Sequence, residues 1–170
     1  HGEQRSLQLP DNTIVRLNSD SAIVVSFDRH QRRVEVTRGQ AYFEVAKDPS
    51  RAFGVQVDGL LIKDIGTAFD VYRQGTDTTV TVAEGRVQVW HASPVPSADW
   101  FGRDLPAPLG RAPILDLAAG HQARIATSGT VESQGPVDVQ RATAWTQGSI
   151  AFENQSIAVV AAEFNRYNNL

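Results

Sequence analysis

Short alternating segments separated by turn residues constrain the fold of this chain more than any other feature. Apolar and polar residues alternate over 34–36, 53–57 and 87–90, and a period of two is typical of half-buried antiparallel strands. Turn residues separate these segments, and Asp58-Gly59 is a strong hairpin signal. Such strands recur about every 8–12 residues, which predicts an all-β fold.

A recurring glycine motif joins several of these predicted strands. Residues 64–71 (DIGTAFDV) echo residues 38–45 (RGQAYFEV), and residues 84–89 (EGRVQV) are a third, partial copy. The motif glycines fall at irregular intervals, so the chain is not a repeat with one period. We expect a twisted β-solenoid or a stacked β-hairpin sandwich, in which these glycines supply positive φ or close backbone approach.

The second half of the chain is less regular. Residues 91–113 contain five prolines and no sustained period, which predicts a long Pro-rich loop, and Trp100 and Phe101 are candidates to pin it down. Short strands are expected at Val137–Gln140 and at Trp145–Phe152, and residues 127–136 are polar and turn-rich. Apolar residues then recur at helical spacing from Ile157 to Phe164, which predicts one amphipathic helix.

These patterns predict two domains. Residues 1–142 form the all-β domain, and residues 143–170 begin a second, α/β subdomain that is truncated here. The aromatic residues Trp145, Phe152 and Phe164 are expected at the join between the two.

Composition excludes several functions. A net charge of −3 disfavours broad electrostatic attraction to nucleic acid. The chain has no cysteine, which rules out disulfides, thiolate metal sites and a cysteine nucleophile. The four histidines show no ligand spacing, so we expect neither a metal nor another cofactor. No apolar run approaches the roughly 20 residues of a membrane-spanning helix.

Carboxylates flank the glycine motifs. They are Glu44, Asp64, Asp70 and Glu84. As pairs they are compatible with glycoside hydrolysis, but we expect them to point outward from the strands and solubilise the sheet.

Strand aromatics such as Phe43, Phe53 and Phe69 are expected in the core. No nucleophile elbow and no phosphate-binding glycine loop is present, so the chain is not expected to be an enzyme acting on a substrate.

One dipeptide permits covalent chemistry. In Gly66-Thr67 the threonine hydroxyl can attack the preceding carbonyl, which gives an ester that water hydrolyses. An ordinary glycine turn followed by a β-favouring threonine explains the same residues. The dipeptide also occurs at Gly75-Thr76 and Gly129-Thr130, so its presence alone is weak evidence.

Motifs in order along the chain carry a family resemblance. The segment LPDNTIVRLN (9–18) resembles the opening of the FecR-type periplasmic domain, and RVEVTRGQAYFEVA (33–46) resembles its next stretch. Similar matches occur at IGTAFDV (65–71), VTVAEGRV (80–87) and LAAGHQ (117–122). The run from Trp145 to Tyr167 resembles the opening of the family's C-terminal, STN-like signalling subdomain, although Ser156 stands where proline is usual.

This resemblance implies a function. FecR-type proteins are single-pass inner-membrane regulators (anti-sigma factors) of extracytoplasmic-function sigma factors. Their periplasmic part reads the N-terminal signalling domain of a TonB-dependent outer-membrane receptor, commonly in iron or siderophore uptake. The sigma factor binds a cytoplasmic segment that is absent from this sequence.

The resemblance also suggests sites. Some members cleave themselves at the dipeptide that corresponds to Gly66-Thr67. The subdomain junction is the candidate partner-binding surface, through Trp145, Phe152, Phe164 and Tyr167. The alternative is a cell-envelope carbohydrate-binding β module with an exposed aromatic platform such as Trp100.

Overall fold

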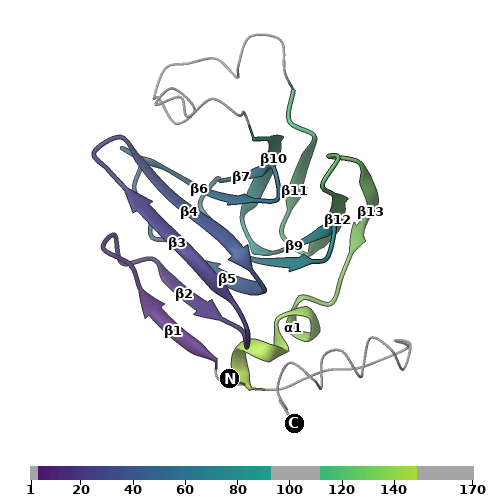
Figure 1. The fold of residues 1–170 in the computed structure, drawn as a ribbon, viewed down its shortest axis with the longest axis horizontal. Helices are drawn as coiled ribbons and strands as arrows, with labels where there is room; N and C mark the ends of the chain where they lie inside the picture. Colours follow the sequence, from purple (N-terminus) through teal and green to yellow (C-terminus); the bar gives the residue numbers. More distant parts are fainter. Residues whose placement is uncertain (1–3, 93–111, 149–170) are drawn as a thin grey trace.

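The computed structural model describes residues 4–92 and 112–148, which form two stacked β-sheets (Figure 1). The first sheet has seven strands in the order β1 (Arg5–Gln8), β2 (Ile14–Leu17), β5 (Gln40–Glu44), β8 (Ala68–Gln74), β9 (Asp77–Glu84), β12 (His121–Ala126) and β13 (Val131–Pro136). The second has six strands in the order β11 (Leu115–Ala118), β10 (Arg86–His91), β7 (Leu60–Asp64), β6 (Ala52–Val57), β4 (Gln31–Arg38) and β3 (Ala22–Phe27). All neighbours pair antiparallel except β4 and β6, which are parallel.

The two sheets share one apolar core. Phe43 and Phe69 stack within the first sheet with ring centroids 5.3 Å apart. Phe43 also meets Phe53 of the second sheet edge to face, at 6.0 Å. All three rings are at most 1% exposed. The expectation of an all-β fold with strand aromatics in the core is confirmed, and the architecture is that of the stacked sandwich.

Four glycines lie at places where the described chain crosses from one sheet to the other. The crossings β4–β5, β7–β8, β9–β10 and β11–β12 occur at Gly39, Gly66, Gly85 and Gly120, whose φ values are 77°, 77°, 76° and 80°. These values lie in the left-handed region, which glycine adopts without the steric cost that a Cβ brings. The motif in the sequence is therefore a repeated corner rather than a repeated unit.

Two of these corners also need the absence of a side chain. A Cβ on Gly85 would lie 2.5 Å from the Gly66 carbonyl oxygen, and one on Gly39 would lie 2.7 Å from the Asp20 carbonyl oxygen. Both distances are shorter than carbon and oxygen tolerate, and both involve backbone, which cannot swing away. The backbones at these corners therefore touch.

The Asp58-Gly59 hairpin is confirmed. Val57 pairs directly with Leu60, and φ is 45° at Asp58 and 74° at Gly59. Positive φ at both central residues defines the type I′ turn, whose twist matches that of the flanking strands.

Three local expectations are wrong. Residues Val139–Ala142 form a short helix, α1, where a strand was expected over Val137–Gln140. The cause is Asp138, whose side chain accepts a hydrogen bond from the Arg141 backbone N–H and so caps the helix. The described start of the predicted strand Trp145–Phe152 is a 3-10 helix, η2 (Ala144–Gln147), which ends at Gly148 in the left-handed conformation.

The third error is at β13, which lies in the segment expected to be polar and turn-rich. This strand is at the edge of the first sheet and is mostly exposed on both faces, so its sequence needs no apolar alternation. Its pairing with β12, across a turn at Gly129, supplies the order that its pattern lacks.

Several expectations fall outside the described residues. These are the helix from Ile157 to Phe164 and most of the Pro-rich loop, including Trp100 and Phe101. No helix within 4–92 or 112–148 is long and apolar enough to cross a membrane.

Candidate functional site

Trp145 anchors the end of the described chain to the β domain. It lies in η2 and is 6% exposed. Its indole N–H donates a hydrogen bond to the Asp70 carboxylate in β8, at 3.1 Å. The Gln4 side chain donates to the Trp145 backbone carbonyl at 2.7 Å. The point where the two predicted domains join is therefore tied to strand β8 and to the N-terminal segment.

A chain of buried hydrogen bonds continues inward from Trp145. The Gln40 side-chain amide donates to Asp70 at 3.0 Å, and Asn18 donates to the Gln40 side-chain oxygen at 2.8 Å. All of these residues are at most 8% exposed. A buried carboxylate is costly unless donors satisfy it, and here Gln40 and Trp145 each satisfy one oxygen of Asp70.

This chain, which we call the junction network (Asn18, Gln40, Asp70 and Trp145), unites the sequence motifs. Each residue comes from a different motif: residues 9–18, 33–46, 65–71 and the run that starts at Trp145. They meet because β2, β5 and β8 are neighbours in the first sheet. The expectation that Asp70 points outward is wrong, since it is 2% exposed.

The Gly66 corner is a second group of polar residues. Asp64 ends β7, and its Oδ2 accepts a hydrogen bond from the Gly66 N–H at 3.2 Å. The carboxylate also accepts from the Thr67 N–H. Burial raises the pKa of Asp64 to about 6, although these two bonds and the nearby Arg32 charge act in the opposite direction. Two buried oxygens here have no hydrogen-bond partner: Asp64 Oδ1 and Thr67 Oγ1.

The structure separates the three Gly-Thr dipeptides. Thr67 is 5% exposed and its hydroxyl is unpartnered. Thr76 is exposed and its hydroxyl donates to Asp77, while the exposed Thr130 hydroxyl accepts from Ser128. Glycine precedes each threonine in the left-handed region, so Thr67 is distinguished by its burial and by its unpartnered hydroxyl.

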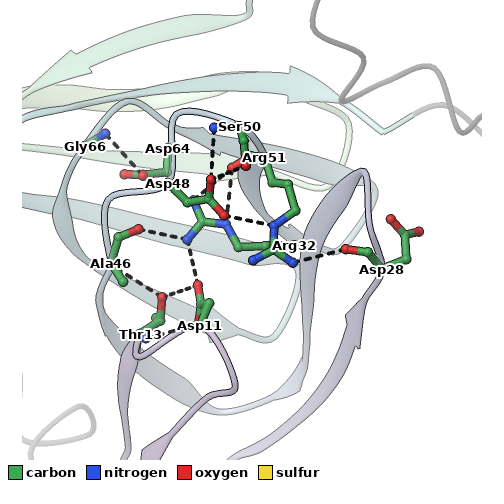
Figure 2. A network of polar contacts seen from close by, with 10 residues as sticks. All are labelled: Asp11, Thr13, Asp28, Arg32, Ala46, Asp48, Ser50, Arg51, Asp64 and Gly66. Atoms are coloured by element: carbon green, nitrogen blue, oxygen red, sulfur yellow. Dashed lines mark hydrogen bonds and ion pairs between the residues drawn. The ribbon is translucent and has the colours of Figure 1, made fainter.

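A buried ion pair lies beside this corner (Figure 2). The Arg32 guanidinium lies 2.6 Å from the Asp11 carboxylate, and both side chains are 3% exposed. Arg32 also donates to the backbone carbonyls of Ala46 and Arg51. Burial opposes the Asp11 charge, but hydrogen bonds from Thr13 and Arg32 outweigh it and hold the pKa of Asp11 below its usual value.

Our reading of the sequence did not predict this pair. One signal pointed to it: Arg32 occupies the same strand face as Val34 and Val36, which are both buried. A charged residue on the core-facing side of an alternating strand requires a buried partner.

The remaining candidate residues are placed as follows. Glu44 forms an ion pair with Arg16 at the surface, and Glu84 is exposed. Phe152, Phe164 and Tyr167 lie outside the described residues, as does Trp100, so the carbohydrate-binding alternative stays a prediction. Within the described ranges no three histidine, cysteine or acidic residues gather as a metal site.

Comparisons with known proteins agree with this architecture. The family model described as "FecR protein" matches residues 1–88. Two crystal structures of a putative anti-sigma factor from Parabacteroides distasonis superpose on the chain with TM-scores of 0.77 and 0.75. Each is 28% identical to it, and each alignment covers 99% of this chain and 72% of the other. No curated protein matches the sequence.

Together the fold and these matches define the class, an all-β regulatory domain. The chain belongs to the FecR family, whose domain is that of a periplasmic anti-sigma regulator. The family resemblance of the sequence motifs is thereby confirmed.

Proposed function

We propose that this chain is the periplasmic signal-receiving domain of a single-pass inner-membrane anti-sigma factor. It reads the N-terminal signalling domain of a TonB-dependent outer-membrane receptor and relays its state to an extracytoplasmic-function sigma factor, in iron or siderophore uptake. Family membership and the similarity to a putative anti-sigma factor over 99% of the chain support this proposal.

The junction network is the observation that best supports a relay of the signal between the two parts of the chain. The Asp70–Trp145 hydrogen bond ties strand β8 to η2, and we propose that these belong to an all-β domain, residues 1–142, and to the start of a separate segment, 143–170. We propose that this segment opens the signalling subdomain and contacts the receptor through its aromatic residues Phe152, Phe164 and Tyr167. A relay needs a mechanical connection between the subdomain that binds and the domain that reports. The network supplies one made of directional, buried hydrogen bonds.

Pull-down with the signalling domain of the cognate receptor tests the proposal. The bait binds the complete periplasmic region of this protein, and the Phe164→Ala and Tyr167→Ala variants weaken binding at least several-fold. The matched control is Val24→Ala. Val24 is exposed on β3 and is distant in sequence from Phe164 and Tyr167. Failure of the folded wild-type region to bind would refute the relay.

A second function rests on the Gly66 corner: single-turnover self-cleavage between Gly66 and Thr67. The observation that favours it is the buried, unpartnered Thr67 hydroxyl beside the peptide bond that it would attack. Such a step is maturation of a regulator and not turnover of a substrate. Intact-mass measurement under denaturing conditions detects it as two fragments, and the Thr67→Ala variant stays as one species.

A further inference from the structure

The Asp64 carboxylate contacts the nitrogen of the peptide bond that self-cleavage would break. Asp64 ends β7, and its carboxylate accepts hydrogen bonds from the Gly66 N–H and the Thr67 N–H. Its second oxygen, Oδ1, is buried and has no hydrogen-bond partner. The Thr67 hydroxyl is likewise buried and without a partner. Each buried oxygen without a partner costs free energy of folding. Transfer of a proton from the Thr67 hydroxyl to Asp64 Oδ1 would use both of them.

We propose that Asp64 is a catalytic residue that carries the proton during self-cleavage at Gly66-Thr67. This inference rests on the second function proposed above. Thr67 Oγ1 attacks the Gly66 carbonyl carbon, and a carbon–oxygen bond forms as Asp64 takes the hydroxyl proton. Asp64 then passes this proton to the Thr67 nitrogen as the carbon–nitrogen bond breaks. The products are an ester, a free amine and the original carboxylate. Water hydrolyses the ester to the Gly66 carboxylate and the Thr67 hydroxyl.

The chemistry of the step requires such a group. A threonine hydroxyl is a weak nucleophile until a base takes its proton, and an amide nitrogen leaves readily only when it is protonated. One carboxyl group can serve both ends when its pKa is close to the working pH. Burial supplies this property, since it raises the pKa of Asp64 to about 6.

The backbone around the corner is held on both sides. The Ile65 N–H donates to the Arg86 carbonyl at 3.1 Å, and the Val45 N–H donates to the Thr67 carbonyl at 3.1 Å. Gly85 leaves room for the Gly66 carbonyl, as its missing Cβ would lie 2.5 Å from that oxygen. These contacts fix the peptide bond relative to the Asp64 carboxylate, and proton transfer depends on such positioning.

The topology predicts what happens after the cut. Fragment 1–66 holds β1–β7, and fragment 67–170 holds β8–β13; each contributes strands to both sheets. The ladders β5–β8 and β7–β10 cross between the fragments. The two pieces therefore stay associated in native buffer and separate only in denaturant, so a native sizing column alone would miss the cleavage.

The experiment follows the whole chain by denaturing intact mass after purification, for wild type, Thr67→Ala, Asp64→Asn and Asp64→Glu. Asn keeps an acceptor for the two N–H groups but cannot relay a proton, whereas Glu keeps the carboxyl group. We expect Asp64→Asn to slow fragment formation about 100-fold or more, the usual contribution of general acid–base catalysis. Asp64→Glu is expected to cleave faster than Asp64→Asn, and hydroxylamine is expected to accelerate release of wild-type fragments by trapping the ester.

The chain offers a matched control at Asp77. Its carboxylate accepts a hydrogen bond from the hydroxyl of Thr76, which belongs to another Gly-Thr dipeptide. Asp77→Asn is expected to leave the rate at Gly66-Thr67 unchanged. Equal cleavage rates in wild type and Asp64→Asn would overturn the role of Asp64 but not self-cleavage itself. The same conclusion would follow if Asp64→Glu cleaved no faster than Asp64→Asn. A wild type that never yields fragments would overturn both. Circular dichroism of each variant verifies that the fold is intact.

Discussion

Replacing Arg32 by methionine tests the energetics of the buried ion pair. Methionine retains much of the length and apolar volume of arginine, so packing over the Phe53 ring, 5.4 Å from the guanidinium carbon, changes little. The charge partner of Asp11 and the donors to Ala46 and Arg51 disappear. The Asp11 carboxylate is then left 3% exposed and unneutralised.

The expected loss is large relative to the stability of a domain. Removing one partner of a buried pair costs about 3–5 kcal/mol, while domains are stable by roughly 5–15 kcal/mol. With a urea m-value of about 2 kcal/mol/M, a loss of about 4 kcal/mol lowers the unfolding midpoint by about 2 M. Urea titration followed by circular dichroism measures this shift directly.

Two further variants separate charge from packing. Adding Asp11→Asn to Arg32→Met removes the stranded charge and is expected to restore about 1–3 kcal/mol. The control is Arg38→Met, whose ion pair with Asp20 is more than 60% exposed on both sides and contributes less than about 1 kcal/mol. If Arg32→Met lost no more than Arg38→Met, or if the double variant recovered nothing, the reasoning about the buried charge would be refuted.

Three other outcomes are expected. Burial raises the pKa of Asp64 to about 6, above its unfolded value of about 3.9, so the carboxylate costs stability as pH rises through that interval. Asp64→Asn therefore stabilises the domain by about 1–3 kcal/mol at pH 8 and by much less at pH 4, and thermal melts at the two pH values measure the difference. Trp145→Phe removes a hydrogen bond to a charged group and lowers the free energy of unfolding by about 2 kcal/mol; a urea midpoint equal to that of wild type would contradict the burial of Asp70. Gly85→Ala strains φ and forces a backbone contact, so in the same assay it loses at least about 1 kcal/mol more than Gly59→Ala, where φ is 74° but nothing lies within 4 Å of the added Cβ.

Local patterns were sufficient to predict the strands that have one buried face. The alternation at Phe53, Val55 and Val57 and the turn at Asp58-Gly59 each specify their own structure within a few residues. The same reasoning missed β13, because an edge strand exposed on both faces has no apolar period. It also misassigned α1, where a single cap at Asp138 decides the outcome against a short and ambiguous pattern.

The candidate sites depend on contacts between distant residues, so local patterns could not show them. Asp64 and Asp70 are both carboxylates near Gly66, and the local sequence pattern gives no reason to distinguish them. The structure buries Asp70 beneath Trp145, 75 residues later in the chain, and leaves one Asp64 oxygen without a partner. The strand order therefore decides which of the two carboxylates has hydrogen-bond donors on both oxygens.

Strand order also explains why the motif glycines and the motif polar residues occur together. A corner at Gly39 starts β5 with Gln40, and the corner at Gly66 leads into β8, which contains Asp70. Gln40 pairs with Tyr72 and Tyr42 with Asp70, so the two strands lie in register. This register brings the Gln40 side-chain amide to the Asp70 carboxylate, and Asp70 in turn accepts a hydrogen bond from the Trp145 indole N–H. We therefore expect a substitution at Gly39 or Gly66 to displace Gln40 or Asp70 and so to disturb the junction network.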